Sequence, residues 1–460
     1  MEPEQAVQRC LDLGAEHAQV RWQSVREARL EVEDGELRRS AAGQEAGFAL
    51  RVLVDGAWGF ASSNDLGNKA WARAAQQAVR LGKAAAAASK HKVALADVPS
   101  MRARVRWQPK IDPVGVDEED KLALLRDLDR AVRVLPEVAS VSAAYRDATV
   151  ETRIVTSEGT DVSWEMTRTV AHATFTAKRD GELAGRSTRV GATRGWETFS
   201  LEDPIEKAVR AAEATVAALG APAAKGGKQT VVMDGELAGV FAHEAVGHAA
   251  EADLVVAGDS CFKGRLGDQV GIEGLTIRDD SSLEGAFGSF PFDDDGVEGR
   301  SRPIVTDGRL TGLLADREHA AALGVEATGS ARAESFAARP LVRMSNTLIE
   351  PGDHPEDEVF EGIKDGVYCR GSRGGQVDTA RGTFLFNAQD AFVIRDGEIA
   401  EPLRDVSLTG SILGTLHNIQ ALGDRQHLGD PGYCGKGQWV PVCDGGPLVR
   451  VADCLVGGAA

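Results

Sequence analysis

The sequence predicts an α+β protein whose N-terminal half consists of antiparallel sheets covered by helices. Its C-terminal half should be a largely β, sandwich-like or barrel-like domain that also carries one functional helix. Three observations predict this fold. Runs of alternating polar and apolar residues recur along the chain. Asp-Gly pairs, which supply the positive φ angles of tight hairpin turns, separate many of these runs. A few segments rich in alanine or leucine have helical spacing instead.

Composition limits the classes of function. The 460 residues are enough for two or three domains, and 43% hydrophobic with 27% charged residues is typical of a globular protein. A net charge of −18 argues against sequence-independent binding to nucleic acid. The N-terminus lacks the features of a signal peptide, and no run approaches the ~20 apolar residues of a membrane-spanning helix. Six irregularly spaced cysteines do not suggest a disulfide framework. We therefore expect a cytoplasmic protein without a membrane or nucleic-acid partner.

The first predicted domain covers residues 1–112. A helix is expected from Gln5 to about Glu16, and an alanine-rich helix from Leu66 to about Lys90 should cover one face of a β-meander. The segment His91–Val114 contains three prolines and is predicted to be an irregular linker. The expected strands are 19–22, 28–32, 37–40, 47–54 and 58–62, with turns at Asp34-Gly35 and Asp55-Gly56.

The second predicted domain covers residues 113–225. It begins with a helix over Asp117–Val134, whose acidic first turn interacts favourably with the helix dipole. Alternating residues from Val138 to Thr198 predict further strands, and Pro204–Leu219 is expected to be another helix. His172 lies within the strand region, where a structural or exposed role is expected.

The third predicted domain covers residues 226–460. It starts with a short strand at Gln229–Met233, a turn or helix start at Asp234-Gly235, and a helix from about Glu236 to Ala250. Short apolar runs between recurrent Asp-Gly pairs predict a largely β body. These pairs are Asp295-Gly296, Asp307-Gly308, Asp365-Gly366, Asp396-Gly397 and Asp444-Gly445.

The most informative stretch lies on that helix, from Phe241 to His248. It places His243, Glu244 and His248 within six residues, a combination that can bind a divalent metal and set a base beside metal-bound water. On a straight α-helix, a separation of five residues turns the second imidazole about 140° from the first. The helix must therefore bend, and Gly247 is the residue most able to permit a bulge or a helix end.

A catalytic zinc site commonly needs a third protein ligand. Cys434 is our candidate, because it lies in a glycine-rich loop and Lys436 nearby could lower the pKa of its thiol. Glu251 and Asp253 are alternative ligands, or else they orient a histidine. Of the other cysteines, Cys443 and Cys454 remain open as contributors, whereas an apolar packing role is expected for Cys10, Cys261 and Cys369.

Glu244 is the candidate general base. We expect it to accept a proton from metal-activated water during attack on a peptide carbonyl and to return that proton to the leaving amine.

The stretch from Phe241 to His248 resembles the H-E-x-x-x-H site of the TldD half of the TldD/PmbA family, zinc metallopeptidases formerly described as modulators of DNA gyrase. Further matches stand in family order across residues 230–460: Arg332-Ala-Glu334-Ser-Phe336, Arg343-Met344-Ser345-Asn346-Thr347, Gly374-Gly375-Gln376-Val377-Asp378, Cys434-Gly435-Lys436 and Val456-Gly457-Gly458. The resemblance implies a cytoplasmic peptidase with Cys434 as a zinc ligand. It also implies an extended substrate along a sheet edge near Gly374, Gly375 and Gln376, and a paralogous PmbA/TldE-type subunit as a partner.

Two functions are therefore carried forward. The first is a zinc-dependent metallopeptidase, with one Zn²⁺ per chain, that hydrolyses unfolded proteins or peptide precursors with low sequence specificity as a heterodimer or a homodimer. The alternative is a non-catalytic binding or assembly protein in which the zinc is structural. A coordination sphere closed by four protein ligands would favour the alternative.

Overall fold

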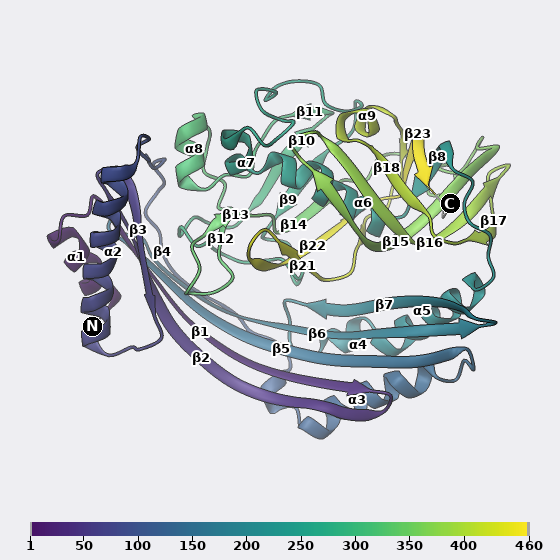
Figure 1. Ribbon diagram of the computed structural model, residues 1–460, viewed down its shortest axis with the longest axis horizontal. Coiled ribbons are helices and arrows are strands. Elements are labelled where there is room, and N and C mark those ends of the chain that lie inside the picture. Colours follow the sequence, from purple (N-terminus) through teal and green to yellow (C-terminus); the bar gives the residue numbers. More distant parts are fainter. Residues whose placement is uncertain (1, 458–460) are drawn as a thin grey trace.

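The computed structural model describes residues 2–457 and has two parts, a long curved sheet with its helices and a C-terminal half that lies over one face of that sheet (Figure 1). The sheet has seven strands in the order β3-β2-β1-β5-β6-β4, and β7 pairs with β6. Neighbouring strands are antiparallel except β4 and β6, which are parallel. The strands are β1 (His17–Glu33), β2 (Glu36–Val54), β3 (Ala57–Ser63), β4 (Arg102–Trp107), β5 (Val138–Thr156), β6 (Asp161–Arg179) and β7 (Glu182–Ala192).

The strands of this sheet are longer than the sequence predicts. The five short strands expected before residue 63 form three, because β1 and β2 each run through a polar stretch without interruption. The predicted hairpin turn at Asp34-Gly35 is confirmed, with φ angles of 50° and 79°. The segment His91–Val114, predicted to be irregular, contains β4, so that prediction was wrong there. Its alternating residues, R-A-R-V-R-W, carried the strand signal.

The division into domains 1–112, 113–225 and 226–460 stays a prediction. The segments on the two sides of residue 112 contribute to one sheet, because β1 pairs with β5 along most of its length.

Helices cover the curved sheet at two places. Near one end, α1 (Pro3–Asp12) and α2 (Asn68–Ala88) pack on β1, β2 and β3 around a core that includes Phe48 and Trp71. Further along, α3 (Glu118–Val132) and α5 (Pro204–Ala218) pack around Tyr145 and Phe175, with the short α4 (Thr198–Leu201) nearby. The C-terminal half lies over the concave side of the sheet (Figure 1).

A closed five-stranded barrel forms the centre of the C-terminal half. Its strands follow one another in the order β15-β8-β23-β18-β16, and pairing between β15 and β16 closes it. In addition, β17 pairs with β16 and β19 with β23. The bounds are β8 (Gly227–Met233), β15 (Asp365–Asp378), β16 (Thr383–Arg395), β17 (Glu398–Leu403), β18 (Ser407–Ser411), β19 (Ile419–Leu422) and β23 (Val449–Gly457).

A second C-terminal sheet has the order β11-β10-β9-β14-β22-β20, with β21 paired to β22. A separate pair, β12 (Ala331–Arg332) and β13 (Leu341–Val342), lies in the loop before β14. The remaining strands are β9 (Ile277–Asp280), β10 (Ser301–Thr306), β11 (Arg309–Leu310), β14 (Asn346–Ile349), β20 (His427–Leu428), β21 (Gly432–Gly435) and β22 (Trp439–Gly446). The C-terminal helices are α6 (Gly235–Phe241), α7 (Ala252–Ala257), α8 (Arg317–Leu323) and α9 (Ile412–His417).

The predicted α+β fold is confirmed, with one helix-covered, mainly antiparallel sheet first and a barrel-containing half after it. Not every predicted turn is a turn. Asp365-Gly366 lies inside β15 and Asp444-Gly445 inside β22, so those two predictions were wrong. Within residues 2–457, no helix is both long and apolar enough to cross a membrane.

Candidate metal centre

The candidate site begins at a capped helix. The Asp234 carboxylate accepts a hydrogen bond from the Leu237 N–H at 2.8 Å, which satisfies one of the free donors at the start of α6. It also accepts from the Gly371 N–H at 3.0 Å and so ties the helix start to β15. Gly239 permits close packing on β22, because a Cβ there would lie 2.3 Å from the Gly445 nitrogen. These contacts fix α6 against the barrel and the second sheet.

The predicted bend in the helix is a π-helical turn. Residues Ala242–Gly247 form this turn, and His248–Ala250 continue as a 3₁₀ turn. A π-turn contains one residue more than an α-turn, so it brings histidines five apart onto one side. The ring centroids of His243 and His248 are 5.3 Å apart. Gly247 lies where a Cβ would meet the Met344 sulfur at 2.0 Å, which explains the need for glycine there.

The structure brings the third predicted ligand to the two histidines. One ligand atom each from His243, His248 and Cys434 lies within 4.8 Å of the others, and all three residues are buried. The Cys434 Sγ is 3.2 Å from the His248 Nε2. Cys434 belongs to β21, a short strand held by pairing with β22. The group therefore joins a helix to a hairpin that lies far along the chain.

The residues present fit a zinc-like ion. Two imidazoles and a thiol are donors that zinc prefers. The His243 Nδ1 is buried without a hydrogen-bond partner, so this nitrogen is not engaged by another group of the described chain. Burial alone would raise the pKa of the Cys434 thiol, but His243 and His248 lower it to about 4. The thiolate, which is the form that binds metals, is thus favoured.

Lys436 does not act as predicted. Its ammonium lies 3.0 Å from a Glu251 oxygen and 2.6 Å from an Asp253 oxygen, and it also donates to the Val342 carbonyl at 3.2 Å. It is therefore engaged by carboxylates, and the histidines lower the pKa of the thiol instead.

Glu251 supports His248 from behind. Its Oε2 lies 2.9 Å from the His248 Nδ1, on the opposite ring nitrogen from the one near Cys434. Such a carboxylate orients a ligating imidazole. Asp253 pairs with Lys436, and neither acid joins the group of ligand atoms. The open alternative of Glu251 or Asp253 as third ligand thus finds no support in the geometry.

Glu244 lies at the open side of the group. Its Oε2 is 3.8 Å from the His248 Nε2, and its side chain is 27% exposed, against 11% for His248. A carboxylate in this place can reach both the ligand group and a molecule arriving from solvent.

Arg343 is a residue that the sequence analysis left without a role at the site. Its Nη2 donates to the Cys434 carbonyl at 2.6 Å and its Nη1 to the Gln438 carbonyl at 2.8 Å. It therefore holds the hairpin that carries the thiol. The motif Arg343–Thr347 was the available signal.

The other cysteines stay outside the ligand group. Cys443 and Cys454 are buried on β22 and β23, and burial raises the pKa of each thiol to about 12. Among residues 2–457, all six cysteines are free of disulfide bonds.

The predicted substrate residues lie on β15, where the glycines have structural roles. Gly374 has a φ of 91° at an irregularity in the pairing with β16, and a Cβ on Gly375 would meet the Phe386 ring at 2.2 Å. Pairing of β15 with β8 covers only residues 366–369. Within the described chain, residues 371–378 thus have a strand on one side only.

Comparisons with known proteins find similar sequences and structures that cover most of the chain. Three models of one metallopeptidase family match: PmbA/TldA domain 1 at residues 18–82, the central domain at 111–219 and the C-terminal domain at 226–458. A metalloprotease of Methanothermobacter thermautotrophicus is 40% identical, with 96% of each chain covered. The zinc metalloprotease TldD homolog of Saccharolobus solfataricus is 28% identical, with 98% and 99% covered. The structure of TldE from Thermococcus kodakarensis has a TM-score of 0.80 at 17% identity and covers 99% of both chains.

Proposed function

Because the chain belongs to the PmbA/TldD family of metallopeptidases, we propose that it is a zinc-dependent peptidase acting on unfolded proteins or peptide precursors with low sequence specificity. The observation that carries the proposal is the buried group of His243, His248 and Cys434, with Glu244 at its open side. The name of the S. solfataricus relative supports zinc as the metal.

One zinc ion per chain would be held by His243, His248 and Cys434. Three protein ligands leave room for a further ligand, as in catalytic rather than structural zinc sites. When bound, zinc supplies Lewis-acid chemistry, which polarises a peptide carbonyl and makes water more acidic.

Glu244 moves the proton in this proposal. Its carboxylate oxygen takes a proton from the attacking water as the new C–O bond forms. The same oxygen then gives the proton to the leaving amine nitrogen as the C–N bond breaks. The Glu244 Oε2 lies 3.8 Å from the His248 Nε2. Glu244 is therefore beside the ligand group but is not proposed as a ligand.

Residues behind the group hold it in place. Glu251 fixes the orientation of the His248 ring, and Lys436 compensates the buried charge of Glu251. Arg343 anchors the carbonyl of Cys434. A site held by such partners needs little rearrangement when a substrate arrives.

Low sequence specificity would follow from binding through the main chain. A peptide added beside residues 371–378 of β15, near Gly374, Gly375 and Gln376, would exchange backbone hydrogen bonds irrespective of its side chains. The unpaired side of this segment supports the proposal.

A paralogous PmbA/TldE-type subunit is the proposed partner, in a heterodimer, with a homodimer as the other arrangement. The likeness in fold to a TldE supports the former. A net charge of −18 and six free cysteines are consistent with a cytoplasmic protein that does not bind nucleic acid.

The test combines metal content with cleavage. Zinc is measured by mass spectrometry in the purified protein and in Cys434→Ala, and cleavage of an unfolded casein is followed alone and with a candidate paralogue. About one zinc per chain, lost together with cleavage in the variant, is the expected result. Zinc retained in full by the variant would remove Cys434 from the site. Zinc without cleavage in any pairing would establish the alternative, a structural metal in a binding protein.

A further inference from the structure

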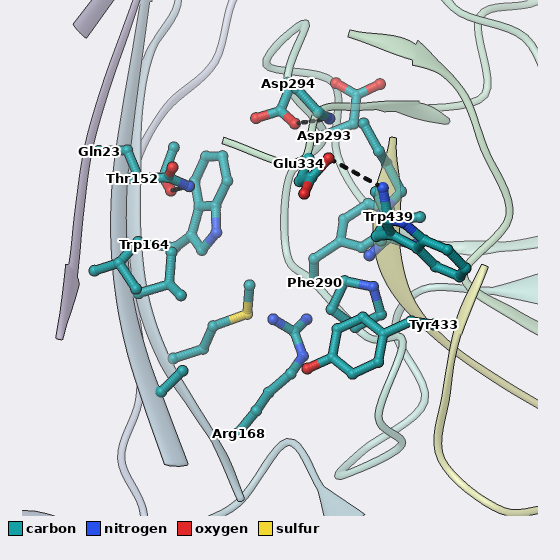
Figure 2. Close-up of a pocket in the computed structure, with 18 of the residues that line it drawn as sticks. Gln23, Thr152, Trp164, Arg168, Phe290, Asp293, Asp294, Glu334, Tyr433 and Trp439 are labelled. Carbon is teal, nitrogen blue, oxygen red and sulfur yellow. Dashed lines mark hydrogen bonds between the residues drawn. The ribbon is translucent and has the colours of Figure 1, made fainter. Parts of the chain in front are cut away.

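A large cavity lies between the concave side of the curved sheet and the C-terminal half (Figure 2). Its volume is about 520 Å³. It is bounded by side chains from β1, β5 and β6 on one side and by the segments around Phe290, Arg332 and Tyr433 on the other. Trp164, Met166 and Phe292 give it largely apolar walls.

Two arginines of this cavity form no direct ion pair with a described residue. Arg168 is 9% exposed, and its Nε and Nη2 donate to the carbonyls of Phe287 and Ser289, each at 2.8 Å. Arg332 is 7% exposed, donates from Nη1 to the Met344 carbonyl at 2.5 Å and stacks over the Phe290 ring. Within residues 2–457, no Asp or Glu forms an ion pair with either one. Their remaining N–H groups find no acceptor there and are left for a ligand in the cavity.

The other lining arginines are ion-paired, and two of the lining carboxylates accept backbone N–H groups. Arg21 pairs with Asp294 at 2.7 Å, and both Arg29 and Arg146 pair with Glu27. Asp293 accepts three backbone N–H groups, and Glu334 accepts from the Trp439 N–H. Arg168 and Arg332 are thus the lining arginines without a direct ion pair in the described chain, although Asp279 and Asp294 lie near enough to Arg332 to raise its pKa.

The pKa values of both guanidiniums are lowered, which reflects the electrostatic cost of burying them. Burial lowers the pKa of Arg168 to about 10, and burial together with Arg168 lowers that of Arg332 to about 9. Two like charges in a poorly solvated space favour any anion that can bind between or beside them.

The cavity and the candidate metal centre are lined by neighbouring residues of β21. Tyr433 lines the cavity, and the next residue, Cys434, faces the histidines, because neighbouring side chains of β21 point to opposite sides. Arg168 and Tyr433 both project into the cavity in Figure 2. Because β21 pairs with β22 alone among the described strands, a peptide at the ligand group enters this space by passing the other edge of β21.

We propose that Arg168 and Arg332 form an anion subsite for a carboxylate of the bound peptide, either its C-terminal carboxylate or the side chain of an Asp or Glu. The inference rests on the proposed peptidase function and adds a charge preference to otherwise unselective main-chain binding. Guanidinium groups suit carboxylates because they offer paired N–H donors in a plane.

Binding of fluorescein-labelled peptides to the Glu244→Gln protein, followed by fluorescence anisotropy, tests the proposal without requiring cleavage. One peptide series carries a single Glu at each position in turn, against the same series with Gln. A second pair compares a free C-terminal acid with its amide. We expect about tenfold tighter binding of the acidic member in one of the two comparisons, as for one charge-assisted hydrogen bond. The comparison that shows the effect identifies the source of the carboxylate.

Substitution then assigns the effect to the arginines. Arg332→Met and Arg168→Met should abolish the preference and leave binding of the neutral peptides unchanged, whereas Arg168→Lys should retain part of it. Arg395→Met removes an equal charge outside the cavity and serves as the control. Equal affinity for all acidic and neutral members, or a preference that survives Arg332→Met, would overturn the subsite. The comparison of acidic and neutral peptides needs no cavity variant, so it tests the charge preference even if a variant fails to fold. Absence of cleavage by the unaltered protein would instead count against the proposed function.

Discussion

Two buried clusters of charge lie on opposite sides of β21, and they are built in opposite ways. At the candidate metal centre, His248, Glu251, Lys436 and Asp253 form a continuous chain of contacts between opposite charges. In the cavity, Arg168 lowers the pKa of Arg332, and within residues 2–457 neither arginine forms a direct ion pair. The first cluster is held by direct ion pairs, whereas in the second only the more distant Asp279 and Asp294 offset the charge of Arg332.

The difference separates two uses of burial. A matched network fixes side chains before any ligand arrives, which is what a catalytic geometry requires. An unmatched charge lowers the stability of the free protein, and a ligand of opposite charge recovers that loss. The two clusters should therefore respond differently to the removal of a single charged group.

The largest effect is expected at the open side of the matched cluster. Glu244→Gln should reduce kcat for peptide cleavage by about 10²–10⁴-fold, because it removes the proposed general base. Zinc content, measured by mass spectrometry, should be unchanged because the group of His243, His248 and Cys434 does not include Glu244. Unchanged turnover would remove Glu244 from the mechanism, and loss of zinc would make it part of the coordination.

Removal of the central cation should break the matched cluster. Lys436→Met removes the closer of the Lys436 and Arg343 contacts to the fully buried Glu251, so we expect a loss of about 3 kcal/mol in the free energy of unfolding in urea. Zinc affinity should fall by about 10–100-fold, since Glu251 would orient His248 less well. Arg210→Met, which removes an exposed ion pair with Glu206, is the control. A loss no larger than the control's would mean that Arg343 already compensates Glu251.

The unmatched cluster should tolerate the same kind of change. Arg332→Met removes a buried charge that has no direct ion pair in the described chain, together with one hydrogen bond to a carbonyl, two effects of opposite sign. We expect the free energy of unfolding without ligand to change by less than about 1 kcal/mol. Urea unfolding beside Lys436→Met measures the contrast. Equal destabilisation by the two variants would contradict the distinction between the clusters.

The smallest effect on the free energy of unfolding should come from Asp161, a carboxylate near the surface of the curved sheet. Its effect can be compared with those of the buried charged groups above. Burial alone would raise the pKa of Asp161, but hydrogen bonds from Arg153 and Arg104 lower it to about 2. Because the folded pKa lies below the ordinary value of 3.8, Asp161 contributes stability above that pH. This contribution is lost as the pH falls towards 2.

Thermal unfolding of the unaltered protein and Asp161→Asn measures this contribution. The difference between them at neutral pH should be about 1 kcal/mol at most, and it should shrink below about pH 4. A difference that grows on acidification would reverse the sign assigned here.

Local patterns predicted local structure well. The amphipathic spacing and capping signals placed α2, α3 and α5 within a few residues, and the spacing of His243 and His248 required the bend that the π-turn supplies. The pairing of β1 with β5 was not predictable, because it joins segments more than a hundred residues apart and leaves no local periodicity. Asp444-Gly445 misled for a related reason, since strand pairing with β14 overrides its turn preference.

The site divides in the same way. His243, Glu244 and His248 are neighbours in sequence, and Cys434 was chosen for its glycine-rich surroundings. The role of Lys436 was assigned wrongly because its nearest charges, Glu251 and Asp253, reach it only through the tertiary fold. Of the cavity arginines, Arg332 stands in one of the family-like motifs but without an assigned role, and Arg168 carried no signal. Arg168 sits in an ordinary alternating strand, and only the packing of the two halves shows that it lacks a partner.

The closure of the barrel has a consequence for how the protein is made. A ribosome completes β8 and the π-turn long before it reaches β21, and β23 follows later still. Until β23 pairs with β8 and β18, the barrel that supports α6 stays open, and until β21 forms the histidines have no thiol beside them. While the chain is still being synthesised, the proposed active site therefore cannot form and cannot cleave the unfolded N-terminal segment of the same chain. The order of the strands delays completion of the candidate metal centre until the curved sheet has all of its residues available to fold.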